Sequence, residues 1–215
     1  GQILPGKFIP VLEQNGLISE VDKYIWEKAC RQLKQWKDAG REDMYLSVNI
    51  SPKDFYFLDI YSIFTGLVEK NGIKPKNLRL EITESALSVN LERQLELINK
   101  LRAYGFSVEM DDFGSGYSSL SMLKDTNVDT LKVDMGFLQN TADVEKSRKI
   151  LEMVIGLCKK LNLRVVVEGV ETAEQVRFLT ELGCDVFQGY YFARPMPIED
   201  LMIPIRSVPD SVTPK

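Results

Sequence analysis

Short apolar runs alternate along the chain with longer stretches in which apolar residues recur every three or four positions. The short runs predict β-strands over residues 45–50, 78–82, 107–110, 130–133, 164–167 and 186–192. Glycines that follow the longer stretches, at positions 40, 72, 105 and 183, are typical of residues just past helix ends. Uninterrupted alternation of strands and helices predicts a parallel sheet with the helices outside it.

Helix starts are marked by polar residues at capping positions. Ser19 with Asp22 has the spacing of a capping box, as does Thr172 with Gln175. Ser51 is followed by Pro52, which suits the first position of a helix, and that helix is expected to run to Gly72.

Each predicted strand has one apolar and one polar side. In residues 78–83, three aliphatic side chains alternate with Arg79, Glu81 and Thr83. A doubly wound sheet and a (β/α) barrel both fit the strand–helix order, but no glycine-rich phosphate loop follows a first strand. Polar residues instead stand at the carboxyl end of nearly every strand, which is typical of the active-site face of a barrel. We therefore predict an α/β, TIM-like (β/α) barrel.

Length and strand count predict that this barrel is incomplete. A full barrel takes about 250 residues, whereas this chain has 215 and six predicted strands. Because Pro5 and Gly6 resemble a strand-to-helix connection, we expect the first one or two strands to be missing. We assign residues 1–202 to the barrel domain and residues 203–215, which are polar and contain three prolines, to a tail or linker.

Composition excludes several kinds of chemistry. The 27 Lys and Arg residues against 31 Asp and Glu residues give a net charge of -4, which argues against coating DNA or RNA. The absence of histidine removes Ser-His-Asp catalysis and most zinc sites. Three widely spaced cysteines indicate buried free thiols in a reducing compartment. With no membrane span or signal peptide in the sequence, we expect a cytoplasmic domain without membrane contact.

Seven short motifs occur in one order along the chain. They are Phe8-Ile9-Pro10, Asn49-Ile50-Ser51, Glu81-Ile82-Thr83-Glu84, residues 111–120 (DDFGSGYSSL), Lys132-Val133-Asp134, residues 168–172 (EGVET) and Gln188-Gly189-Tyr190. Together they resemble the EAL domain family of cyclic di-GMP phosphodiesterases, over about residues 5–202. The resemblance implies a TIM-like barrel whose first strand is antiparallel. It also implies hydrolysis of cyclic di-GMP to linear pGpG with two Mg²⁺ or Mn²⁺ ions.

The resemblance also implies a set of metal ligands. By position, Asn49, Glu81 and Asp111 would bind the first metal ion. Asp111 would bridge to the second metal ion, which Asp112 and Glu168 would help to hold. Oxygen ligands without Cys or His independently favour Mg²⁺ or Mn²⁺ over zinc. Since neighbouring strand residues point to opposite sides, the chain must turn between Asp111 and Asp112, and we expect residues 113–116 to supply that turn.

Other residues carry catalytic, substrate and loop roles by the same resemblance. Lys132 would orient the attacking water, and Glu168 is also a candidate general base. Gln188 and Asp134 are candidate substrate-binding residues. Arg194 is a further candidate from its position on the loop after the last strand, where it fits contact with a phosphate or a surface role equally well. Glu84 would anchor the loop of residues 112–119, in which Ser115 replaces the threonine that the family usually has; in the family this loop couples metal binding to dimerisation.

Alternatives to this assignment remain open. Each acid alone also fits a structural ion pair, such as Glu81 with Arg79 or Lys132 with Asp111. Gln188 also fits a residue that only satisfies backbone groups. The family's Glu-Ala-Leu motif, whose glutamate is a first-metal ligand, does not occur in this sequence.

We therefore expect a phosphodiesterase domain whose turnover is impaired in this chain alone. The alternative is a catalytically silent cyclic di-GMP receptor or a protein-interaction module. The resemblance further implies a homodimer and fusion to sensor or GGDEF-type domains in the parent protein.

Overall fold

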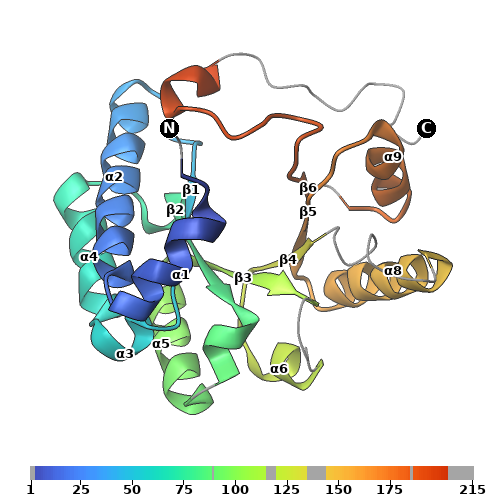
Figure 1. The fold of residues 1–215 in the computed structure, drawn as a ribbon, viewed down its shortest axis with the longest axis horizontal. Helices are drawn as coiled ribbons and strands as arrows, with labels where there is room; N and C mark the ends of the chain where they lie inside the picture. Colours follow the sequence, from blue (N-terminus) through green and yellow to red (C-terminus); the bar gives the residue numbers. More distant parts are fainter. Residues whose placement is uncertain (1–2, 89, 115–119, 135–143, 185, 203–215) are drawn as a thin grey trace. The chain divides into compact units, whose positions relative to one another are not determined.

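The computed structural model describes residues 3–88, 90–114, 120–134, 144–184 and 186–202. Its chain falls into two compact units (Figure 1). The first comprises Gly1–Asp111 and Ser119–Asp129, and the second comprises Asp112–Ser118 and Thr130–Lys215. Ser115 and the predicted tail, residues 203–215, lie outside the described residues.

The first unit is an α/β unit with three parallel strands. Its elements in chain order are α1 (Pro5–Asn15), α2 (Ile18–Asp38), β1 (Leu46–Ile50), α3 (Asp54–Phe57), α4 (Ile60–Asn71), η1 (Pro75–Asn77), β2 (Leu78–Thr83), η2 (Glu84–Ser88), α5 (Leu91–Tyr104), β3 (Ser107–Phe113) and α6 (Leu120–Asp125). β1 pairs with β2, and β2 pairs with β3. The strands start within one residue of the predicted positions.

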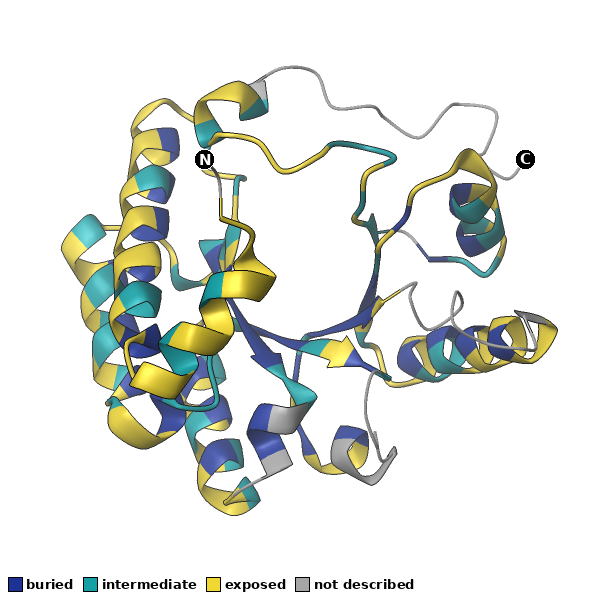
Figure 2. Ribbon diagram, viewed as in Figure 1, coloured by how far each residue is buried: buried dark blue, intermediate teal, exposed yellow. Residues whose placement is uncertain are grey.

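Aromatic and aliphatic side chains between the strands and helices form the core of this unit. Trp26 of α2 and Phe64 of α4 are fully buried, with ring centroids 4.6 Å apart. The indole Nε1 of Trp26 donates to the carbonyl oxygen of Asn49 at 2.9 Å, which ties α2 to the end of β1. In Figure 2 the strands are largely dark blue, and the outer sides of α2 and α4 are yellow. The apolar side of each strand thus faces the helices, as the alternation predicts.

The second unit repeats the strand–helix pattern. It contains β4 (Thr130–Asp134), α8 (Val144–Lys160), β5 (Arg164–Glu168), α9 (Ala173–Glu181), β6 (Val186–Phe187) and η3 (Ile198–Met202). β5 lies between β4 and β6, and both pairings are parallel. Leu131, Val167 and Leu179 are fully buried in its core. The three cysteines of the chain, Cys30, Cys158 and Cys184, are buried thiols outside any disulfide, as expected.

Apart from strand ends that shift by up to three residues, three boundaries differ from the prediction. α2 begins at Ile18 without a side-chain cap, so the predicted capping box of Ser19 and Asp22 is wrong. Ser19 is buried inside the first turn, and tertiary burial outweighs the capping preference there. The single helix expected between Ser51 and Gly72 is two helices, because Asp59 caps the backbone N–H of Ser62 and starts α4.

The predicted strand 186–192 is the third difference, since β6 ends at Phe187. The backbone after Phe187 bonds to the turn that follows β5 and leaves the strand direction. The capping box of Thr172 and Gln175 at the start of α9 is confirmed. Within the described part of the chain, no helix is long and apolar enough to cross a membrane.

Candidate active site

Three predicted metal ligands come from the carboxyl ends of the three strands of the first unit. Asn49 of β1 is the register partner of Glu81 of β2, so the two side chains start side by side on one face. Asp111 of β3 pairs with Thr83, two residues beyond Glu81 and on the same face. Glu81 is 9% exposed, whereas Asn49 is exposed. The structure thus brings an amide and carboxylates to one end of this sheet.

A third carboxylate on this face was not singled out from the sequence. Glu109 is the register partner of Glu81 on β3 and is 2% exposed. Its Oε1 accepts from Nη1 of Arg79 at 3.0 Å, and its Oε2 accepts from Oγ of Ser47 at 3.1 Å. The guanidinium of Arg79 also lies 3.4 Å from the ring centroid of Tyr45. The ion pair of Arg79 is thus formed with Glu109, not with Glu81 as one alternative had it.

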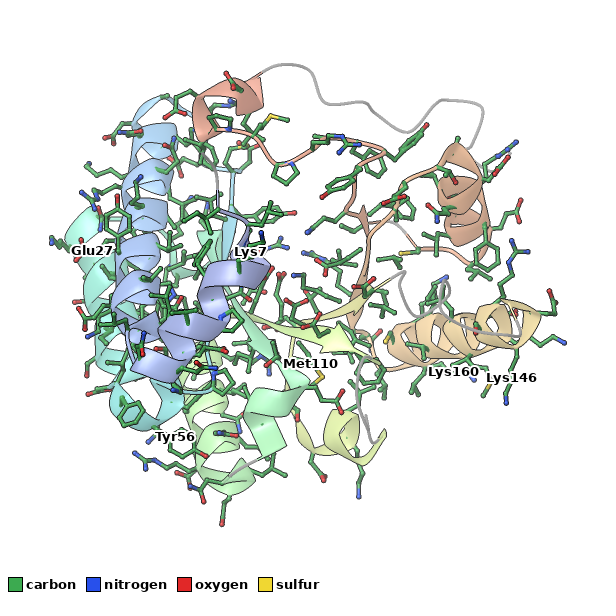
Figure 3. The ribbon with its side chains drawn as sticks, viewed as in Figure 1. Lys7, Glu27, Tyr56, Met110, Lys146 and Lys160 are labelled. Atoms are coloured by element: carbon green, nitrogen blue, oxygen red, sulfur yellow. The ribbon has the colours of Figure 1, made fainter. Side chains whose placement is uncertain are left out.

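The sequence does carry a signal for Glu109. In residues 107–111 the apolar positions are Val108 and Met110, which are buried on the other side of β3. Met110 is labelled in Figure 3. Strand alternation therefore assigns Glu109 to the polar face together with Asp111.

The turn between Asp111 and Asp112 lies one residue earlier than predicted. β3 continues to Phe113, and Asp112 itself has a left-handed backbone, with φ of 56°. Aspartate tolerates this conformation better than most residues. The change of direction at Asp112 gives the two adjacent aspartates different orientations, and Asp112 is exposed. Glu84, the predicted loop anchor, is half-buried at the start of η2.

The predicted catalytic residues Lys132 and Glu168 form an ion pair in the second unit. Nζ of Lys132, on β4, lies 2.9 Å from Oε1 of Glu168, on β5, and the side chains are 5% and 16% exposed. Asp134 is the register partner of Glu168 and is exposed. The alternative pairing of Lys132 with Asp111 joins residues of different units and stays a prediction.

The turn after β5 is fastened to the segment that carries Gln188. The backbone N–H of Gln188 donates to Val167 at 2.9 Å, and its carbonyl accepts from Val170 at 3.0 Å. A β-carbon on Gly189 would overlap the backbone nitrogen and carbonyl oxygen of Val170, so only glycine fits there without displacement. The main chain of Gln188 therefore satisfies backbone groups while its side chain stays exposed.

The last predicted substrate residue, Arg194, lies on the surface of the same unit. Its guanidinium is 4.7 Å from the ring centroid of the exposed Tyr190. Tyr191 and Phe192 instead pack against each other with ring centroids 5.1 Å apart.

The predicted metal ligands are divided between the two units. Asn49, Glu81 and Asp111 belong to the first unit, and Asp112 and Glu168 belong to the second. Among the described residues, no group of three or more Asp, Glu or Cys side chains is placed to hold a metal ion. The donor chemistry nevertheless fits Mg²⁺ or Mn²⁺, since every predicted ligand supplies oxygen.

A surface hollow of about 650 Å³ lies elsewhere in the first unit, between the α3–α4 connection and the start of α5. Tyr56, which is labelled in Figure 3, and Phe57 line it and are largely exposed. None of the predicted site residues borders this hollow.

Comparisons with known proteins match nearly the whole chain. A family model described as "EAL domain" matches residues 1–195. The chain is 38% identical over 202 residues to the bifunctional diguanylate cyclase/cyclic di-GMP phosphodiesterase MucR of Pseudomonas aeruginosa, covering 94% of this chain and 30% of that protein. It is also 38% identical to the signaling protein YkoW of Bacillus subtilis, covering 91% of this chain and 24% of YkoW. The chain thus spans about a quarter to a third of these curated relatives.

Solved structures agree with the family match. The structure described as "PaMucR Phosphodiesterase, c-di-GMP complex" is 38% identical with a TM-score of 0.88, covering 94% of this chain and 82% of that one. The EAL domain of Mycobacterium smegmatis DcpA is 30% identical with a TM-score of 0.79, covering 86% and 83%. These similarities confirm the predicted α/β, TIM-like barrel class of fold. The chain belongs to the EAL domain family.

Proposed function

We propose that this chain is a phosphodiesterase domain that hydrolyses cyclic di-GMP to linear pGpG with two Mg²⁺ or Mn²⁺ ions. The observation that carries the proposal is the ion pair of Lys132 and Glu168 at the carboxyl ends of neighbouring strands. A lysine and a carboxylate held together with little exposure are typical of a catalytic site on a barrel. MucR is named a cyclic di-GMP phosphodiesterase, and its solved structure is a complex with c-di-GMP; both support cyclic di-GMP as the substrate.

The proposed metal ligands are those of the family pattern. Asn49, Glu81 and Asp111 would hold one ion, and Asp111 would share the other with Asp112 and Glu168. Bound divalent ions polarise a phosphoryl oxygen and make a bound water acidic enough to attack at neutral pH. Four carboxylates close together also repel one another unless cations neutralise them, so the ions would stabilise the site as well.

The side chains of the chain itself would position the reactants. The ammonium group of Lys132 lies 2.9 Å from one oxygen of Glu168 and would orient the attacking water. Glu168 would accept the proton of that water as general base, in addition to its role as a ligand. Gln188, Asp134 and Arg194 would contact the nucleotide, and Glu84 would anchor the loop of residues 112–119, including Ser115.

We propose that the domain works as a cytoplasmic homodimer within a longer signalling protein that also carries sensor or GGDEF-type domains. Its relatives are several times longer than the match, and MucR combines two activities by name. A segment upstream would supply the glutamate of the Glu-Ala-Leu motif, and turnover would be impaired without it.

The test is cyclic di-GMP turnover by the natural full-length protein with Mn²⁺ or Mg²⁺, followed by chromatography of the nucleotides. We expect pGpG as the product and a loss of at least about 100-fold in turnover for Glu168→Ala. Glu181→Ala, which removes an exposed carboxylate at the end of α9, is the control and should keep full activity. Tight cyclic di-GMP binding without turnover in the natural protein would contradict the proposal and favour a receptor.

A further inference from the structure

The polar face of the first unit holds an arginine next to a proposed metal ligand. Arg79 and Glu81 are two residues apart on β2, so both side chains extend from the same face. An arginine keeps its charge under all conditions in a protein, and its planar group matches a carboxylate well. Without another partner, Arg79 would compete strongly with any cation for Glu81.

Glu109 holds this arginine in place. Its carboxylate lies across from Glu81 in the register of β2 and β3, is 2% exposed, and pairs with Arg79 at 3.0 Å. The second oxygen of Glu109 is occupied by Ser47, and the guanidinium face is covered by Tyr45. Contacts on several sides therefore fix the arginine on the oxygen of Glu109.

We propose that Glu109 is a positioning residue of the site: by binding Arg79, it keeps the guanidinium off Glu81, so that the arginine does not compete with a divalent cation for that carboxylate. The inference rests on the proposed function, and deepens it by naming what controls the affinity of the first-unit ligands for a metal ion.

The charge balance of this face explains the effect. With Glu109 present, the charges of Arg79 and Glu109 cancel, so the arginine adds no positive charge that competes for Glu81 or Asp111. The Arg79 side chain is only 12% exposed, so it is poorly hydrated. Without Glu109, its positive charge has no partner there. The other carboxylates on its face of β2 and β3 are Glu81 and Asp111. Pairing with either one neutralises a proposed ligand and occupies its oxygens.

This account predicts a pattern across three variants that loss of packing alone would not produce. Glu109→Gln keeps the size of the side chain but releases the arginine, so metal affinity should fall. Arg79→Met with Glu109→Gln removes the competitor as well, so metal affinity should return. Arg79→Met alone leaves Glu109 as an additional carboxylate across from Glu81, so metal affinity should not fall although the protein should unfold at a lower temperature.

The experiment is calorimetric titration of the metal-free full-length protein with MnCl₂, together with thermal unfolding. We expect Glu109→Gln to weaken Mn²⁺ binding at least ten-fold and the double variant to lie within three-fold of the natural protein. The control is Asp129→Asn, which breaks the 2.7 Å ion pair with Arg102 in the same unit. It should lower the unfolding temperature and leave Mn²⁺ affinity unchanged.

Two results with the variants would overturn the inference. One is a Glu109→Gln variant that binds Mn²⁺ as tightly as the natural protein does. The other is a double variant that binds Mn²⁺ as weakly as Glu109→Gln does. A natural protein that binds Mn²⁺ but does not turn over cyclic di-GMP would overturn only the proposed function, because the affinities still decide the role of Glu109. A natural protein that binds neither Mn²⁺ nor Mg²⁺ would overturn both.

Discussion

Gly189 is the residue on which the position of Gln188 depends most directly. Its missing side chain lets the backbone of Val170 approach, and two backbone hydrogen bonds of Val170 then join the turn after β5 to the segment after β6. Glu168 ends β5 just before this turn. A change at Gly189 should therefore disturb the proposed catalytic residue as well as Gln188.

We predict that Gly189→Ala destabilises the protein by about 1–3 kcal/mol, because the new methyl group must displace backbone. Gly156→Ala is the matched control in the same unit. Gly156 lies inside α8, and a β-carbon there has no neighbour within 4 Å. The Gly156→Ala substitution should stabilise the protein by about 0.5–1 kcal/mol. Urea unfolding of both variants gives the two values, and equal signs would contradict this explanation.

Strand alternation predicts the face of some side chains correctly and fails for others. Alternation alone assigns Arg79, Glu81 and Glu109 to one face. It does not say which carboxylate the arginine selects, because the register of neighbouring strands decides that. At Asp112 alternation fails, since a single left-handed residue inside β3 changes the direction of the chain.

The carboxyl groups of Asp22 and Asp54 face each other near the end of β1. Asp22 lies in the second turn of α2, and Asp54 starts α3 and is fully buried. One buried oxygen of each, Oδ2 of Asp22 and Oδ1 of Asp54, has no N–H or O–H partner among the described residues. Burial first, and then the charge of Asp54, raise the pKa of Asp22 from 3.8 to about 7. A proton that Asp22 retains and directs at Asp54 accounts for both observations.

This pair predicts a stability that falls with rising pH. The unfolded chain releases the proton of Asp22 near pH 3.8, whereas the folded chain keeps it up to about pH 7. Between these values the folded state binds more protons, so the free energy of unfolding decreases as pH rises and levels off above 7. The carboxyl groups of Asp54 and Glu13 face Asp22 and add to the rise, whereas the Ser51 hydroxyl opposes it. Nζ of Lys53 is bound to the carbonyl of Glu13.

We expect Asp22→Asn to flatten this pH dependence, because an amide is neutral throughout. Its gain in stability over the natural protein should be largest above pH 7. Urea unfolding at several pH values between 4 and 8 measures it, with Asp43→Asn as the exposed control in the same unit. An equally steep fall in both variants would show that another group titrates.

The same aspartate explains one element that the sequence misplaced. Asp22 has the spacing to bond back to Ser19, but its carboxyl group is engaged with Asp54 and Ser51. Such a partner lies 29 or more positions away in the chain, where local spacing carries no information. Thr172 and Gln175 have no such competitor, and their capping box forms as predicted.

For the whole molecule, the sequence predicted the class of fold and its parallel strands because both depend on periodicity and order. The candidate site could be predicted from the sequence only in part. Strand ends and motifs predict ligands in each of two compact units, and register places Asn49 beside Glu81. The combination of ligands from both units into one metal centre depends on long-range packing, and stays part of the proposal.

The proposed hydrolysis of cyclic di-GMP requires divalent cations held by these carboxylates. The most direct test is turnover by the natural full-length protein before and after dialysis against EDTA. We predict that turnover to pGpG is lost on chelation and returns on addition of Mn²⁺ or Mg²⁺. Undiminished turnover in the metal-free protein, or none with either ion added, would contradict the account.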